Sequence, residues 1–449
     1  MHPPVAIYSK RCWIDGDFSP FTLILENGKI SDLIQGRKEI MYLPFSDFGN
    51  DVIMPGVIDA HVHINEPGRT AWEGLKTATL AAAAGGITTL VDMPLNAHPV
   101  TTTVAALNQK KAAFSAEKRT VNIGFYGGLV PGNANELEGL IHAGVLGIKA
   151  FLVHSGIDDF PNVRKRDLET AMEMMAPYHV PLLVHCELEP QGQQPTSFSK
   201  PYSYRQYLQS RPKAWENEAI RLMIELCEKY KCPIHIVHVS SAEALELIAR
   251  ARKKGLPVTA ETCPHYLYFY AEGIPDKNAL FKCAPPIREQ ENNQQLKSAF
   301  RSGILDFIAS DHSPAPPEIK EIDSGNLSKA WGGISGLQYL LSGAWSALKK
   351  ELTLEEFIPL LTEHPARFLG ISDRKGFLKT GQDADLTIWS PEMDFIVRKE
   401  ANQHRHKISP YTGERLYGKV TATYVNGIAV FNKKLNNKTP GTWVFKKQH

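Results

Sequence analysis

The stretch VIMPGVIDAHVHI, residues 52–64, combines a long β-branched run with two histidines at alternate positions. Seven further apolar runs follow it, at residues 87–93, 121–129, 147–153, 181–186, 234–239, 257–262 and 304–310. Helix-like segments separate most of these runs, at residues 72–84, 135–143, 166–175, 216–230, 242–253 and 289–301. Strands that alternate with helices eight times are typical of a closed parallel barrel, so we predict an α/β fold with a (β/α)8 TIM-type barrel.

A doubly wound open sheet is the structural alternative to the barrel. That fold class commonly carries Gly-x-Gly-x-x-Gly after an early strand, and the sequence has no such motif there. Residues 334–371 have the pattern of additional helices that close the barrel unit.

The two ends of the chain have a different texture, with short β-type runs between turns. Residues 21–25 precede Asn27–Gly28, and residues 422–425 and 428–431 flank Asn426–Gly427. Asn-Gly between two apolar runs is a hairpin signal. We therefore predict a small β-sandwich domain built from residues 1–53 and 373–449, with the barrel occupying residues 54–372.

Composition excludes several classes of partner. The formal net charge is +2, from 50 basic and 48 acidic residues, so nothing in the overall charge favours nucleic acid or an anionic membrane. No apolar stretch of membrane-spanning length and no secretory signal is visible. The six scattered cysteines form no disulfide framework, which indicates a reducing compartment and predicts a cytoplasmic protein.

His61 and His63 carry the sharpest chemical signal. Side chains at alternate positions of a strand point the same way, so both imidazoles can bind one metal ion. In a barrel they would lie near the carboxyl end of the first strand, where active sites are found. Two ordinary buried histidines are the alternative for this pair alone.

Four more candidate ligands occupy the same relative place on other strands. Lys149 lies inside residues 147–152, His185 ends residues 181–185, His238 lies in residues 234–239, and Asp311 follows residues 304–310. Catalytic groups of a barrel come from the ends of several strands. Together with the histidine pair, these residues predict a metal centre.

Lys149 and Asp311 have the most specific expected roles. A charged lysine in an apolar strand beside metal ions is costly, which favours the neutral amine. A neutral amine can add carbon dioxide to give a carbamate, whose carboxylate-like head could bridge two metals. Asp311 can bind metal and also accept a proton from a water activated by the metal. The alternatives are a lysine paired with an acid for Lys149 and a helix cap for Asp311.

Three nearby residues are interpreted as having no role in metal binding. His235 lies three positions before His238, so on a regular strand it should face the opposite way. Cys186 alternates with His185 and should point away from the barrel interior. His265 follows a strand and could border the site, but is not assigned to the metal.

Taken together, these residues carry a family resemblance. Asp59–Ala–His–Val–His63, the single strand lysine, the two later histidines and Asp311 resemble the cyclic amidohydrolases of the amidohydrolase superfamily, over nearly the whole chain. The resemblance implies that His61 and His63 bind one divalent metal ion, usually zinc, and that His185 and His238 bind a second. It further implies that carbamylated Lys149 bridges the two ions and that Asp311 binds the first and shuttles the proton.

Within that group, the sequence resembles the allantoinase family most. Dihydroorotases usually carry an arginine where Asn65 stands, whereas residues 67–74, 92–96, 147–152 and 210–216 look like allantoinase segments. Ala71 and Ala150 depart from the usual residues of that family, and neither is a proposed ligand. The resemblance implies that a hydroxide bridging two metals hydrolyses the ring amide of allantoin to allantoate, in purine (ureide) catabolism. A hydantoinase or dihydropyrimidinase-type enzyme and a non-enzymatic dihydropyrimidinase-like scaffold are the alternatives.

The resemblance extends to substrate and assembly. Asn96, the backbone around Cys283, and Ser313 occupy positions that resemble ring-binding sites in this group, with ordinary loop residues or a packed thiol as the alternative. The expected partner is a small cyclic ureide substrate, and the family implies a homotetramer.

Overall fold

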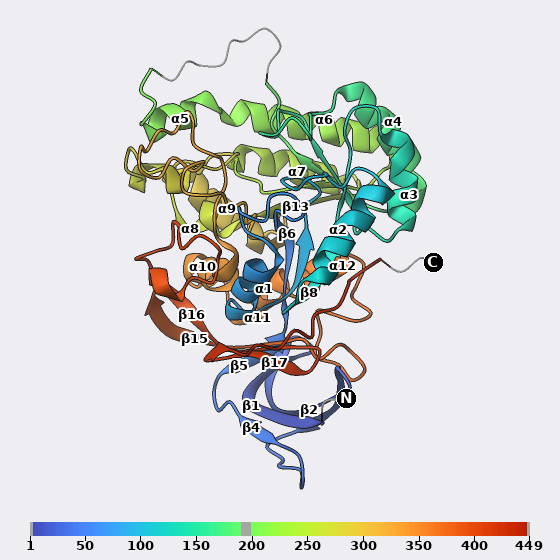
Figure 1. Ribbon diagram of the computed structural model, residues 1–449, viewed down its shortest axis with the longest axis vertical. Helices are drawn as coiled ribbons and strands as arrows, with labels where there is room; N and C mark the ends of the chain where they lie inside the picture. The colour runs from blue at the N-terminus through green and yellow to red at the C-terminus, as the bar shows by residue number, and fades with distance from the viewer. Residues whose placement is uncertain (1–2, 190–198, 447–449) are drawn as a thin grey trace.

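A computed structural model describes residues 3–189 and 199–446. The outer ends of the predicted terminal segments therefore lie outside the described residues. Figure 1 shows a large barrel unit with helices around it and, at one end, a sheet to which both the first and the last strands contribute.

The barrel consists of parallel strands that follow one another around a closed wall. β6, β7 and β8 pair in that order, and β9 to β14 pair in chain order. Tyr126 alone separates β8 from β9, and its amide donates to Asp92 while that of Gly127 donates to Gly147. The wall closes where Val62 pairs with His312. The strand bounds are Val57–Val62, Ile87–Asp92, Asn122–Phe125, Gly127–Gly128, Ile148–Phe151, Leu182–His185, Ile234–Ile236, Val258–Thr262 and Phe307–Ile308.

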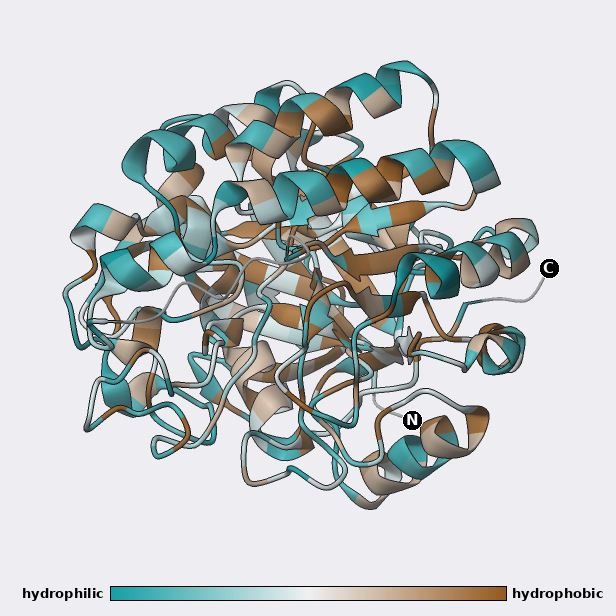
Figure 2. Cartoon of the chain, turned by 90° about the horizontal axis from the view of Figure 1, so that it is seen from above, coloured by the Kyte–Doolittle hydropathy of each residue, from teal (hydrophilic) through white to brown (hydrophobic). Residues whose placement is uncertain are grey.

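Helices cover the outside of this wall, and their polar residues face outward in Figure 2 while apolar strands fill the centre. The helices between strands are α1 Leu75–Ala84, α2 Val104–Ala116, α3 Leu137–His142, α4 Lys165–Met175, α5 Tyr204–Ser210, α6 Lys213–Tyr230, α7 Leu245–Lys253, α8 Pro264–Tyr268 and α9 Gln290–Arg301. After the last strand come α10 Leu340–Leu348, α11 Leu354–Phe357 and α12 Glu363–Phe368. The predicted fold class is confirmed, and α2, α5 and α8 are helices outside the predicted segments.

Both chain ends contribute to one nine-stranded sheet, as predicted. Its order is β18-β17-β16-β15-β5-β1-β2-β3, with β4 beside β1. The turn between β2 and β3 also contacts the segment before β15. The amide of Ala384 donates a hydrogen bond to the carbonyl of Gly28 at 2.8 Å. Both predicted Asn-Gly hairpins are present. The strand bounds are Val5–Ile14, Asp17–Glu26, Lys29–Gln35, Phe45–Asp47, Val52–Pro55, Leu386–Ile396, Arg415–Val425, Ile428–Asn432 and Lys434–Leu435.

Gly56 joins this sheet to the barrel and divides the stretch 52–64 into two strands. β5 pairs with β1 and β15 in the terminal sheet, and β6 begins the barrel. A Cβ on Gly56 would lie 2.1 Å from Oγ1 of Thr88, so a side chain there has no room. The predicted domain boundaries at 53/54 and 372/373 stay a prediction, and the first of them falls inside β5.

The packed interior follows the same division. The largest apolar cluster lies between the barrel wall and its helices, a second lies inside the barrel, and a third lies within the terminal sheet. Burial of these side chains is the main stabilising contribution to each unit. Across the residues that the structure describes, no helix combines the length and the apolar character needed to cross a membrane.

Candidate metal centre

Three of the predicted ligands converge where the first and last barrel strands meet. His61 and His63 lie at and just beyond the end of β6. Asp311 follows β14 and immediately precedes His312, which pairs with Val62 of β6. The Nε2 atoms of His61 and His63 lie 3.3 and 3.5 Å from Oδ1 of Asp311. One ligand atom from each residue lies within 4.8 Å of the others, so the group could hold a metal ion.

His185 and His238 form a second group on the opposite strands. Nδ1 of His185, at the end of β11, lies 2.9 Å from Nε2 of His238, which follows β12. The rings of His61 and His238 have their centroids 5.5 Å apart, so the two groups are neighbours. The structure thus brings two pairs of imidazoles to one place at the carboxyl end of the barrel.

Unusual backbone geometry places two of these side chains. His238 has a φ of +41° and Asp311 a φ of +43°, in the left-handed region that costs non-glycine residues free energy. At both positions the regular strand has already ended, and the chain turns the side chain toward the barrel axis. Such backbone strain commonly occurs at functional sites.

Lys149 lies in β10, which pairs with the strand that ends at His185. The residue is completely buried, and its Nζ has no hydrogen-bond partner among the residues that the structure describes. The ammonium position lies 4.9 Å from the centroid of the Phe151 ring. Burial lowers the pKa of Lys149 to about 8, although Asp311 and Glu261 act in the opposite direction. The neutral amine is therefore accessible near neutral pH.

The electrostatics of the site suit metal ligation. Burial lowers the pKa values of His63, His185 and His238, so these imidazoles are neutral near pH 7. Burial opposes ionisation of Asp311, but its interactions with His61 and His63 outweigh that effect and hold the pKa well below the usual range. Neutral imidazole and ionised carboxylate are the forms that bind metal.

Two buried carboxylates that the sequence pattern did not predict contact the histidines. Glu261 in β13 accepts from Nδ1 of His61 at 2.6 Å. Glu187, two residues after His185, lies 2.8 Å from Nε2 of that histidine. Metal-binding histidines commonly pair their second nitrogen with a carboxylate, which fixes the ring and the tautomer. Thr259 and Glu261 occupy alternate positions of β13, so their side chains lie on the same face of the strand. Two polar residues on one face are the pattern that could have pointed to Glu261.

The expectation that His235 faces away from His238 is wrong. Nε2 of His235 lies 3.2 Å from Oε2 of Glu261, whose other oxygen contacts His61. β12 ends at Ile236, and the positive φ of His238 breaks the alternation on which the expectation rested. His235 therefore lies deeper in the barrel interior, stacked on Phe307. Cys186 does pack outside with the helices, as expected.

A cavity of about 430 Å³ opens above these ligands. His61, His63, His185, His238 and Asp311 all line it, and Phe151 and Trp331 form part of the wall. A cavity of this size suits a small ligand.

The three predicted substrate contacts are placed differently around the cavity. Asn96 and Ser313 line it, whereas Cys283 does not and only its neighbours Lys282 and Ala284 do. The carbonyl of Cys283 accepts from the Tyr207 hydroxyl at 2.5 Å. The amide nitrogen of Asn96 lies 3.2 Å from Nδ1 of His63, and its amide oxygen has no partner within the described part of the chain.

Asn65 and His265 lie beside the site rather than in the cavity wall. Asn65 is buried and donates to the carbonyl of Asn96 at 3.2 Å, so it contacts the cavity only through that residue. His265 is also buried, and burial lowers its pKa to about 4. Neither residue lines the cavity.

Comparisons with known proteins agree with this geometry. The profile of the amidohydrolase family matches residues 52–430. An allantoinase from Arabidopsis thaliana is 45% identical over 402 residues, which cover 86% of this chain and 79% of that protein. An allantoinase from Saccharomyces cerevisiae is 38% identical, with 98% of both chains covered. Among solved structures, an L-hydantoinase (dihydropyrimidinase) from Arthrobacter aurescens aligns with a TM-score of 0.90 at 29% identity, over 98% of this chain and 99% of that one.

Proposed function

Because the chain belongs to the amidohydrolase family and, within it, to the allantoinases, we propose that it hydrolyses the ring amide of allantoin to allantoate. The observation that carries this proposal is the convergence of His61, His63 and Asp311 at the cavity, beside a second histidine pair. The reaction would serve purine (ureide) catabolism. A cytoplasmic location and a homotetramer belong to the same proposal.

Two divalent metal ions, assigned as zinc, fit the donors that the cavity presents. Imidazole nitrogen and carboxylate oxygen are both zinc ligands in proteins. His61, His63 and Asp311 would hold the first ion, and His185 and His238 the second. When bound, the ions supply a nucleophilic water at neutral pH and polarise the carbonyl that is attacked.

Lys149 would join the two groups of ligands as a carbamate. Its neutral Nζ attacks the carbon of carbon dioxide, an N–C bond forms, and one proton leaves, which gives an anion with two oxygens. The buried and unpartnered state of Nζ supports this assignment, because an uncompensated amine is costly there and a carbamate between cations is not.

Asp311 has both a binding and a proton-transfer role in this proposal. Its carboxylate accepts the proton of the attacking water while the new C–O bond forms at the ring carbonyl. As the ring C–N bond breaks, the same carboxyl returns the proton to the leaving nitrogen. The low pKa of Asp311 keeps the carboxylate ionised before the reaction.

Substrate contacts are assigned to Asn96, Ser313 and the backbone around Cys283. Asn96 and Ser313 line the cavity, and the unpartnered amide oxygen of Asn96 can accept from a ring or ureido N–H. The neutral Asn65 behind Asn96 offers no counter-charge for a substrate carboxylate. These features favour an uncharged ureide over a carboxylated ring.

A hydantoinase-type activity is the second candidate, since the L-hydantoinase structure superposes over nearly the full chain. A panel of allantoin, hydantoin, dihydrouracil and dihydroorotate distinguishes the two. We expect kcat/KM for allantoin to exceed the others by at least about 100-fold, because a substrate without the ureido group leaves buried polar groups unpaired. The chain treated with a chelator provides the background rate. Equal turnover of hydantoin and allantoin would assign the chain to the hydantoinase activity instead.

A further inference from the structure

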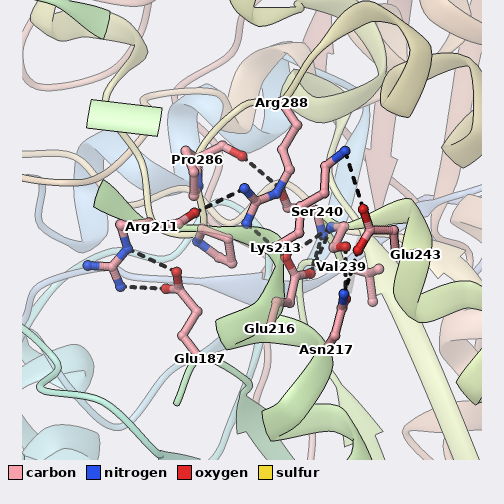
Figure 3. A network of polar contacts seen from close by, with 12 residues as sticks. Glu187, Arg211, Lys213, Glu216, Asn217, Val239, Ser240, Glu243, Pro286 and Arg288 are labelled. Atoms are coloured by element: carbon pink, nitrogen blue, oxygen red, sulfur yellow. Dashed lines mark hydrogen bonds and ion pairs between the residues drawn. The ribbon is translucent and has the colours of Figure 1, made fainter. Parts of the chain in front are cut away.

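Glu187 and Arg211 form an ion pair that contacts His185, one of the proposed ligands. Glu187 is completely buried, and its Oε2 lies 2.8 Å from Nε2 of His185. Arg211 contacts both oxygens of that carboxylate, with Nε at 2.9 Å and Nη2 at 2.5 Å (Figure 3). A two-point contact of this kind fixes the orientation of the carboxylate and also supplies its counter-charge. The carboxylate therefore has a defined position relative to the imidazole.

The contact determines which nitrogen of His185 faces the cavity. A carboxylate paired with arginine can only accept, so Nε2 of His185 must carry the hydrogen. Nδ1 then has a free lone pair, and this is the atom that points toward His238 at 2.9 Å. The ion pair thus prepares His185 as a ligand through Nδ1.

The same network continues to the other histidine of the pair. Arg288 donates to the carbonyl of Arg211 at 3.0 Å and lies 3.3 Å from Oε2 of Glu216. Glu216, at the start of α6, accepts the backbone amides of Ser240 at 2.7 Å and Ser241 at 2.9 Å. These serines follow His238 by two and three residues, so one network connects the side chain of His185 with the backbone that follows His238.

We propose that Glu187 and Arg211 are positioning residues for the second metal ion, and that Arg288 and Glu216 extend their effect to the backbone after His238. Neither Glu187 nor Arg211 is assigned a contact with the ion. This inference rests on the proposed function, because it presumes that His185 and His238 bind metal. It also gives a role to residues 210–216, because Arg211 and Glu216 connect the end of β11 with the segment that follows β12.

The test is Glu187→Gln, with metal affinity as the readout. Arg211 will hold the amide oxygen of the new side chain and turn its NH2 group toward Nε2 of His185. That donor favours the opposite tautomer, with the hydrogen on Nδ1. We expect the second zinc ion to bind about 10- to 100-fold more weakly and the first to be unchanged, as measured by equilibrium dialysis with elemental analysis. Turnover should recover at high zinc.

Glu243→Gln is the matched control, because Glu243 lies at the exposed end of the same network and contacts Asn217 and Lys213 rather than a histidine. It should bind two ions with wild-type affinity. Circular dichroism checks folding, and if Glu187→Gln does not fold, Arg211→Lys, which loses the two-point contact, takes its place with the same expectation. Two ions bound at wild-type affinity in the folded variant would overturn the inference. A wild-type chain that binds fewer than two ions would instead contradict the proposed function.

Discussion

We expect the replacement of Asp311 with asparagine to lower kcat for allantoin by roughly 10²- to 10⁴-fold even when zinc is in excess, the range typical for the loss of a positioned acid–base group. Asparagine has nearly the same shape and keeps one oxygen, but it cannot take a proton from water or return one to the leaving nitrogen. Asp311 is placed for this role by its contacts of 3.3 and 3.5 Å with His61 and His63. Steady-state assays of allantoate formation measure the change.

Asp306→Asn provides the comparison for Asp311. Asp306 precedes β14 at the other end of the strand and contacts Arg252 and the amide of Ala260. This variant should keep kcat within a few-fold of the wild type. Elemental analysis of both variants separates proton transfer from metal loss. Substantial turnover by metal-replete Asp311→Asn would exclude the proposed acid–base role.

Replacing Lys149 with methionine removes the only proposed ligand shared by the two groups. Methionine fills a similar volume in the buried strand, but it cannot carry a carbamate. We expect the variant to lose at least one metal ion and to turn over allantoin at least about 10³-fold more slowly, because activation of water by the metal centre supplies several kcal/mol of the rate enhancement. Elemental analysis and the allantoin assay measure these effects.

The carbamate itself can be observed with labelled bicarbonate. Protein equilibrated with ¹³C-bicarbonate should show one carbamate carbon signal, and Lys149→Met should lack it. Lys110→Met is the control, because it removes an equally buried amine that is already bonded to Asp92 and the carbonyl of Met93. The control should keep the signal, although it will be less stable. A fully active wild-type enzyme without any carbamate signal would contradict the assignment.

Hydrophobic pattern predicts most of this fold because strands and helices have different periods. The barrel strands coincide with the apolar runs, and the Asn-Gly pairs mark real hairpins. The division at Gly56 was not predicted, because a continuous apolar run does not show where a chain leaves one sheet for another. α2 was missed as well, since its residues alternate little between apolar and polar faces.

The candidate ligands could be found from sequence because they lie in or just after five different strands, and barrel geometry brings the carboxyl ends of those strands together. The buried carboxylates could not be found in the same way. Glu187 and Glu261 act through contacts with His185 and His61, and such contacts depend on side-chain direction. The interpretation of His235 failed for a related reason, since alternation holds only until the strand ends and His238 lies beyond that point.

Stepwise reconstitution of the metal-free chain tests the central claim most directly. Zinc is added back in the presence of bicarbonate while bound metal and allantoate formation are measured together. The proposed site predicts negligible turnover without metal and maximal turnover of allantoin at two ions per chain. Full activity without bound metal, or a chain loaded with two ions that leaves allantoin intact, would contradict it.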